Sequence, residues 1–234
     1  MKKILTRILA FCLMFSLVGC SSKTNRNDIL TVFDALDSTL EATSAHIKGT
    51  LEYSTDDKNI ISLDISYIQE DNLQVKAIMD LESNKNKIPD YLQFYIKDGK
   101  TYLKNLDTTS QSVVENIGLQ KDGKISVFNP FTSYTDDKLV SFFTSSSKKG
   151  DTYNLELDPK QVATLIDSMG TLSISKCSVQ ATIKDDYLEN ISLTLDGYMA
   201  YSDYTSDVNI VLNCDIDQIN SLSQITFPDD LTAY

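Results

Sequence analysis

The sequence predicts an α+β domain in which helices pack on one side of a single, strongly curved antiparallel sheet. Two blocks of alternating apolar and polar residues predict strands, and helical patterns stand before and between these blocks. The clearest single signal is a hairpin, in which Tyr91–Lys97 and Lys100–Lys104 flank Asp98-Gly99. Asp-Gly suits a type I′ turn because both central residues of that turn take positive φ.

A helix precedes the first block of strands. Apolar residues at helical spacing predict this helix over residues 28–43, with Asn27 or Asp28 as its cap. The period then changes to two, which predicts strands over 45–53, 61–67 and 73–81. These three strands form a meander with one dry face and one wet face.

The middle of the chain has weaker patterns. Thr135 and Asp158 are typical caps, and Pro159 suits the first turn of a helix. The elements expected here are a short helix over Val113–Gln120, a short strand over Ile125–Phe128, a helix over Asp136–Ser145, a loop over Ser145–Gly150, a strand over Tyr153–Leu157 and a helix from Pro159 to Gly170.

A second meander closes the predicted domain. Alternating residues predict strands over 177–183, 191–195 and 208–216, which place Cys177 and Cys214 on the apolar face. One strand separates the two cysteines, or about 10 Å sideways, which exceeds the reach of a disulfide. Two buried thiols are therefore favoured over a disulfide, although an exported chain could form one.

Composition and charge exclude some classes of partner. Hydrophobic residues make up 41% of the chain and charged residues 23%, which suits a packed core. Without Lys2, Lys3 and Arg7, the 21 basic residues fall to 18 against 33 acidic ones, a formal charge of −15. Such a chain has no electrostatic reason to bind nucleic acid, and an anionic membrane surface would repel it. The acidity favours solubility, with a cationic partner as the less favoured interpretation.

The first twenty residues predict export. Lys2, Lys3 and Arg7 precede an apolar run over residues 8–18, which is too short to cross a bilayer as a stable helix. The run ends in Leu17-Val18-Gly19-Cys20, which is similar to the lipobox of bacterial lipoproteins. The resemblance implies a signal peptide over 1–19, cleavage before Cys20 and a diacylglycerol on the Cys20 thiol. Residues 20–27 would form a lipidated tether and 28–234 one domain. The alternative is an ordinary signal peptide with a chance cysteine.

No residue pattern predicts catalysis, a metal or a cofactor. His46 is the only histidine, and its place at a strand start on the polar side favours a hydrogen-bonded surface residue. Acidic pairs recur where turns, helix starts or a terminus are expected, and we interpret them as local structural residues. Tyrosines cluster at Tyr91, Tyr95 and Tyr102 and at Tyr198, Tyr201 and Tyr204. They are more typical of a covered core rim than of a binding surface.

The order of these elements resembles one family. The lipobox, the leading helix, the meanders, the hairpin YIKDGKTYLKN at 95–105 and a closing strand ending in Phe227-Pro228 look like the LolA/LppX/LprG-like half-barrel lipoproteins. The resemblance implies an unclosed half-barrel with helices across its concave face. It also implies an apolar cavity, which holds acyl chains in some members.

The expected function is therefore that of a lipid-anchored protein on the extracytoplasmic side of the cell membrane, which binds or carries a lipid or another hydrophobic ligand and is not an enzyme. The alternative is a non-catalytic cell-envelope lipoprotein that acts through contacts with a protein partner. A hydrolase using acidic residues is the least favoured interpretation. LolA itself is a soluble carrier, so a shuttle between membranes is not expected of a tethered chain.

Overall fold

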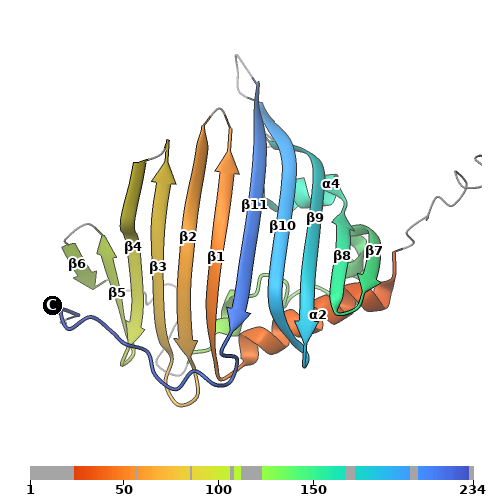
Figure 1. The fold of residues 1–234 in the computed structure, drawn as a ribbon. Coiled ribbons are helices and arrows are strands. Elements are labelled where there is room, and N and C mark those ends of the chain that lie inside the picture. Colours follow the sequence, from red (N-terminus) through yellow and green to blue (C-terminus); the bar gives the residue numbers. More distant parts are fainter. Residues whose placement is uncertain are drawn as a thin grey trace, which may run out of the picture.

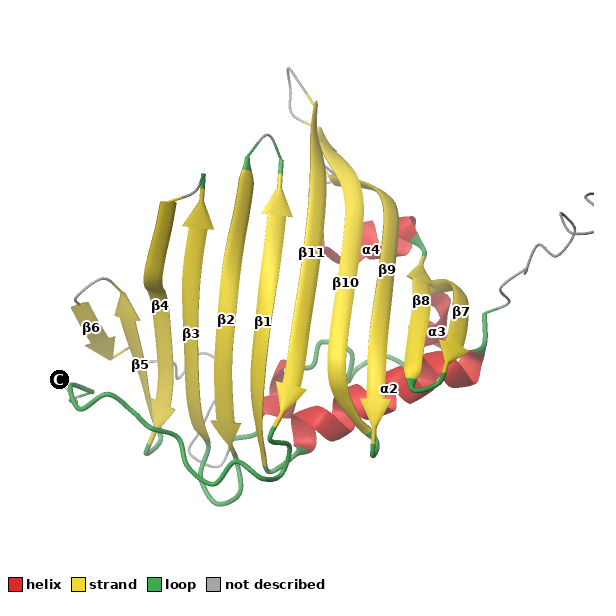
Figure 2. Ribbon diagram, in the orientation of Figure 1, coloured by secondary structure: helices red, strands yellow, loops and turns green. Residues whose placement is uncertain are grey.

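The strands of this protein form one open antiparallel sheet with helices on its concave face, which confirms the predicted fold class (Figures 1 and 2). Within the described residues, the sheet has eleven strands in the order β6-β5-β4-β3-β2-β1-β11-β10-β9-β8-β7. The edge strands β6 and β7 lie at opposite ends, so the half-barrel is unclosed. The computed structural model describes residues 24–55, 57–84, 86–105, 108–111, 123–166, 172–200 and 205–231.

The two predicted meanders are confirmed, and they meet at the centre of the sheet where β1 pairs with β11. Asp98 and Gly99 both take positive φ, as the predicted hairpin turn requires. The strands are β1 (Ser44–Ser54), β2 (Lys58–Ile68), β3 (Gln74–Ser83), β4 (Asn86–Lys97), β5 (Lys100–Asn105), β6 (Thr108–Gln111), β7 (Phe143–Lys149), β8 (Thr152–Leu157), β9 (Leu172–Lys184), β10 (Tyr187–Ala200) and β11 (Thr205–Asp217).

Strand β4 begins at Asn86, before the expected Tyr91. Pro89 lies inside it, beside a register shift between Met79 and Leu81 on β3. A proline lacks the N–H that a regular ladder needs, and such bulges are where strands accept it.

The first helix, α2 (Arg26–Glu41), lies against β7, β8, β9 and β10. Its cap is Asn25, whose side chain accepts a hydrogen bond from the N–H of Asn27 at 3.1 Å. The prediction of Asn27 or Asp28 as the cap was therefore wrong by two or three residues, because Asn25 offers the same local hydrogen bond earlier. Asp28 lies in the first turn, where a carboxylate favours the positive end of the helix dipole.

The segment after Thr135 differs from the prediction. Helix α3 (Asp136–Ser141) is capped by the Thr135 side chain as expected, but it ends four residues early. The expected loop Ser145–Gly150 is mostly strand β7. Residues 143–149 are polar at most positions, but backbone pairing with β8 stabilises an edge strand without an apolar pattern.

Of two further helical elements, the first contradicts the prediction and the second begins as predicted. The expected strand Ile125–Phe128 is wrong, because these residues form a 3-10 helix, η2. Helix α4 (Pro159–Ile166) begins as predicted, with the Asp158 carboxylate accepting from the N–H of Lys160 at 2.8 Å. The expected helix 113–120 and the expected helix end at Gly170 lie outside the described residues.

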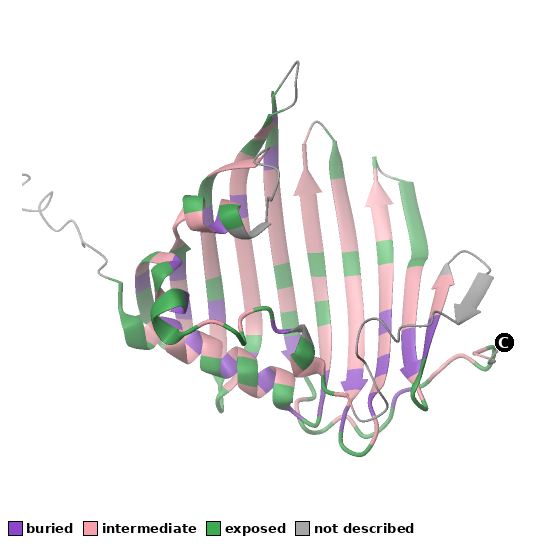
Figure 3. Cartoon of the chain, turned by 180° about the vertical axis from the view of Figure 1, so that it is seen from behind, coloured by how far each residue is buried: buried purple, intermediate pink, exposed green. Residues whose placement is uncertain are grey.

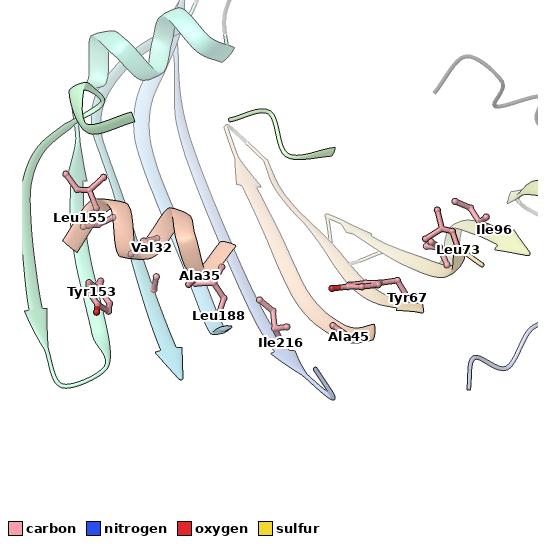
Figure 4. Packing of buried hydrophobic residues seen from close by; sticks show 13 residues of the cluster. Val32, Ala35, Ala45, Tyr67, Leu73, Ile96, Tyr153, Leu155, Leu188 and Ile216 are labelled. Carbon is pink, nitrogen blue, oxygen red and sulfur yellow. The ribbon is translucent and has the colours of Figure 1, made fainter. Parts of the chain in front are cut away.

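The main core lies between α2 and the lower ends of the strands, as Figure 4 shows. Tyr67 on β2 donates a hydrogen bond to the carbonyl of Thr39, and the Thr39 hydroxyl accepts one from the N–H of Leu188 on β10. Both meanders are thereby tied to the end of α2. Burial raises the pKa of Tyr67 to about 12, with a smaller contribution from Tyr187, so its phenol stays protonated. The buried residues of this cluster are Ile29, Val32, Ala35, Ala45, Tyr67, Leu73, Val75, Ile96, Tyr153, Leu155, Ala181, Leu188 and Ile216.

The C-terminal segment, residues 218–231, has no regular structure, so the expected closing strand ending in Phe227-Pro228 is wrong. It crosses the face of the N-terminal strands that lies away from α2 (Figure 1). Phe227 packs edge-on against Tyr95, with ring centroids 6.3 Å apart, and Asp230 pairs with Lys104 at 2.5 Å. The N–H of Asn220 donates to the carbonyl of Ser44 at 2.8 Å at the start of this segment, and ring packing and an ion pair hold its end.

Candidate functional site

Apolar side chains on the helix-bearing face of β11 and β1–β4 are only half-buried, in contrast to those of the core below them. We call this surface the open apolar face. Its members are Leu51, Tyr53, Ile61, Leu63, Met79, Leu81, Leu92, Ile210 and Leu212.

Strand register brings these residues together. Leu51 on β1 lies directly opposite Ile61 on β2 and Leu212 on β11, and Leu63 lies opposite Met79 on β3. Residues directly opposite each other project on the same side of a sheet, so the set forms one continuous surface. The predicted alternation of apolar and polar positions along these strands is confirmed.

The helices cover one half of this side of the sheet. In Figure 3, α2 and α4 lie over the C-terminal strands. No described helix crosses β1–β4 at the end of the sheet where β1 connects to β2. Val162 of α4 packs against Cys177 and Leu195. Ile210 packs against the same cluster, which therefore forms a wall beside the open apolar face.

A pocket of about 420 Å³ lies on the open apolar face. A volume of a few hundred Å³ is typical of small-molecule sites, which are mainly apolar with a few polar groups. The surface that lines this pocket is apolar throughout, and the hydroxyl of Tyr53 donates to the sulfur of Met199 at 3.7 Å. The lining residues are Leu51, Tyr53, Asn59, Ile61 and Ile210.

Within the described residues, Cys177 and Cys214 are free and lie on the helix-bearing face, as the sequence predicts. Burial raises the pKa of the Cys177 thiol to about 11, with a smaller contribution from Glu156. Burial also raises the pKa of the Cys214 thiol, with a smaller contribution from Asp215. Both thiols are therefore protonated at neutral pH, and a protonated thiol is a poor nucleophile and a poor metal ligand.

The opposite face of the sheet is polar. His46 makes hydrogen bonds to Asp217 at 2.8 Å and Asp64 at 3.3 Å, which confirms the expected hydrogen-bonded surface residue. A shallow hollow of about 380 Å³ next to it contains Lys48, Asp80 and Asp215. Among the described residues, no group of three or more His, Cys, Asp or Glu side chains could hold a metal ion.

The acidic pairs within the described residues have structural surroundings. Asp136 and Asp137 start α3 and pair with Arg26 at 3.3 and 2.6 Å. Asp185 and Asp186 form the β9–β10 turn, both at positive φ. Of the predicted tyrosine clusters, Tyr95 and Tyr102 are buried, whereas Tyr91 and Tyr198 are exposed. Asp56, Tyr201 and Tyr204 lie outside the described residues.

Sequence reasoning identified which strand positions are apolar but named no pocket residue. The missing information was the placement of α2 and α4, since the apolar pattern itself is equally strong under the helices and beside them. Cys20, the predicted lipid attachment site, lies outside the described residues. Within the described part of the chain, no helix has the length and apolar character needed to cross a membrane.

Comparison with solved structures gives distant matches. LprF from Mycobacterium bovis matches 88% of this chain and 97% of its own, at 10% sequence identity and a TM-score of 0.45. A putative outer membrane lipoprotein-sorting protein domain from Vibrio parahaemolyticus matches 89% of this chain and 95% of its own, at 12% identity and a TM-score of 0.29. No family model and no curated protein matches the sequence. At this distance, the function has to be argued from the chain's own residues.

Proposed function

We propose that this chain is a membrane-anchored extracytoplasmic lipoprotein that binds or carries a lipid or another hydrophobic ligand on the open apolar face. The observation that carries the proposal is the half-exposure of this continuous apolar surface and the pocket of about 420 Å³ within it. Contiguous apolar surface facing water costs roughly 25 cal/mol per Å², and such patches mark interaction sites.

The shape of the site favours a small hydrophobic ligand. The pocket lies beside the packed cluster of Val162, Cys177 and Leu195, so a ligand on Leu51 and Ile61 would have a wall on one side and the sheet as a floor. Although Asn59 and Tyr53 contribute to the lining, the surface that they present to the pocket is apolar. An apolar ligand or an acyl chain matches this lining.

Anchoring is proposed from the sequence. Lipidation of Cys20 would place the domain on the extracytoplasmic side of the cell membrane, and two acyl chains suffice for stable attachment. The formal charge of −15 in the predicted mature chain gives no electrostatic attraction to anionic lipids, so the lipid itself would supply the attachment.

We also propose that the domain has no catalytic activity. The chain's single histidine is held by Asp64 and Asp217 on the face opposite the pocket. The two described thiols stay protonated at neutral pH.

Native mass spectrometry with organic extraction, on the domain starting at Ser21, tests the proposal. We expect a co-purifying lipid, lost on delipidation and taken up again from a membrane lipid extract. An apo mass without uptake would contradict ligand binding. It would favour the alternative, an envelope lipoprotein whose half-exposed apolar face contacts a protein.

A further inference from the structure

The described chain starts on an edge of the sheet. Thr24 donates its hydroxyl to the carbonyl of Thr144 on β7 at 2.9 Å, and the N–H of Asn25 donates to the hydroxyl of Ser146 at 2.7 Å. The same hydroxyl donates to the carbonyl of Asn25 at 3.4 Å, and Ser146 is buried. The N-terminal end of α2 lies beside β7, at the end of the sheet opposite β6 (Figure 1). The point where the chain enters the domain is therefore fixed on β7.

The distance from this point to the predicted anchor is short. Only four residue steps separate Cys20 from Thr24. A fully extended chain spans at most about 3.6 Å per residue, so the two Cα atoms lie within about 14 Å of each other. A lipid on Cys20 would hold β7 close to the bilayer surface.

Charge distribution favours the same orientation. Residues 24–28 and 136–160, which contain β7 and its neighbours, carry five basic side chains against six acidic ones. The predicted mature chain carries 18 against 33, so almost all of the excess negative charge lies elsewhere. Anionic headgroups would repel the remaining surface and tolerate this nearly neutral edge. Lys148 and Lys149, both exposed, end β7.

We propose that the β7 edge, with Thr24, Asn25 and the Lys148-Lys149 end of the strand, is the surface that faces the headgroup layer of the bilayer holding the anchor. This orientation rests on the proposed anchoring at Cys20. Five strand spacings separate β7 from β1, or about 24 Å along the sheet. The open apolar face is thereby held away from the bilayer, and a bound ligand is exchanged above the membrane surface.

Energy transfer to the bilayer tests this orientation. The full lipidated chain is placed in vesicles of phosphatidylcholine with one quarter phosphatidylglycerol and a sparse headgroup-labelled acceptor lipid. A donor dye is attached through Ser147→Cys on β7 or through the matched Ser62→Cys on β2, both at exposed positions. Six strand spacings, or about 29 Å along the sheet, separate these strands. Labelling at pH 7 favours the introduced surface cysteine, because burial raises the pKa of the Cys177 and Cys214 thiols, and the parent chain gives the background.

We expect transfer several-fold stronger from position 147 than from position 62. Equal transfer, or stronger transfer from position 62, would overturn the orientation. Ser146→Ala removes the contact with Asn25 and should reduce the ratio, whereas the control Ser145→Ala should not. An unchanged ratio in Ser146→Ala would overturn the role of this contact. A chain that does not sediment with vesicles would overturn both the anchor and the orientation, whereas ligand uptake by the Ser21 domain in solution tests the binding site separately.

Discussion

A row of apolar side chains that lie directly opposite one another, which we call the rung, crosses eight strands of the sheet. The two ends of the rung have different surroundings. On β8, beneath α2, Leu155 is 1% exposed, whereas on β4 Ile88 is 38% exposed. The strands supply the same kind of residue at both ends, so the covering helices decide which part of the rung becomes core and which part stays accessible. The rung consists of Leu155, Val179, Leu193, Leu212, Leu51, Ile61, Leu81 and Ile88.

The half of the sheet formed by β1–β5 gains its stability in a different way. The C-terminal segment crosses its outer side and contributes Phe227 against Tyr95 and Asp230 against Lys104. Ile225 of the same segment is buried. Because this packing lies on the polar side of the sheet, the helix-bearing side can keep an open apolar face.

The largest expected difference between the halves is in stability. Leu155→Ala should lower the free energy of unfolding by about 2–5 kcal/mol, since it leaves a cavity in the core. The matched change Leu51→Ala, on the same rung but half-buried, should cost clearly less. Urea unfolding of both variants measures the two costs. Equal costs would mean that Leu51 is covered as well as Leu155.

A substitution where the two halves of the sheet meet, at the pairing of β1 with β11, should lower the free energy of unfolding almost as much. A Cβ at Gly49 on β1 would lie 2.7 Å from the Cys214 sulfur and 2.8 Å from the Asn213 carbonyl oxygen. Gly49→Ala should therefore destabilise the protein by about 1–3 kcal/mol, which is typical of overpacking. Adding Cys214→Ala should recover part of this loss, because it removes the sulfur but not the carbonyl. Thermal unfolding gives the comparison, and full additivity of the two changes would argue against this contact.

A smaller effect is expected from the C-terminal segment. Phe227→Ala removes the ring pair with Tyr95 and should cost about 1 kcal/mol. The neighbouring exposed Thr226→Ala is the control. Hydrogen exchange of the β4 and β5 amides should increase in the Phe227 variant and stay unchanged in the control. Equal protection in both variants would contradict a stabilising role for the segment.

A smaller expected difference concerns the alkylation rates of the Cys177 and Cys214 thiols. Alkylation should be slow at pH 7 and accelerate as pH rises, because only the thiolate reacts and burial raises both pKa values. Half-buried Cys214 should react before buried Cys177. Mass spectrometry of the labelled chain measures this order, and a faster Cys177 would contradict it.

The same pKa shifts predict a small loss of stability at high pH. The folded chain keeps the Cys177 proton up to a pKa of about 11, whereas the ordinary thiol pKa is 9.0. The unfolded chain therefore loses its proton first, and the free energy of unfolding should decrease as pH rises from about 9 to 11. The free energy of unfolding of the Cys177→Ala variant should depend less on pH in this range.

Sequence alone was sufficient for the strands whose side chains alternate clearly. The hairpin at Asp98-Gly99, both meanders and the shared face of Cys177 and Cys214 follow from local turn chemistry and period two. It failed for β7, a polar edge strand held by backbone pairing, and for residues 218–231, which are held by side-chain packing and single hydrogen bonds to Ser44. Neither interaction leaves a periodic pattern in the sequence.

The candidate site could be predicted only in part. The pattern identified Leu51, Ile61 and Leu212 as apolar positions of one face, but the same pattern holds for Leu155 and Val179 under α2. Which positions stay accessible depends on long-range contacts of α2 and α4. A single sequence contains no local signal for those contacts.

Ligand uptake by two neighbouring lysine variants tests the central claim most directly. Ile61→Lys places a charge on the open apolar face, whereas Ser62→Lys places the same charge one residue further on, on the polar side of β2. Both delipidated variants, in the domain starting at Ser21, are titrated with a fluorescent fatty acid. If the open apolar face holds the ligand, Ile61→Lys loses at least tenfold in affinity and Ser62→Lys binds like the parent. Equal affinity in both variants would contradict a binding site on this face.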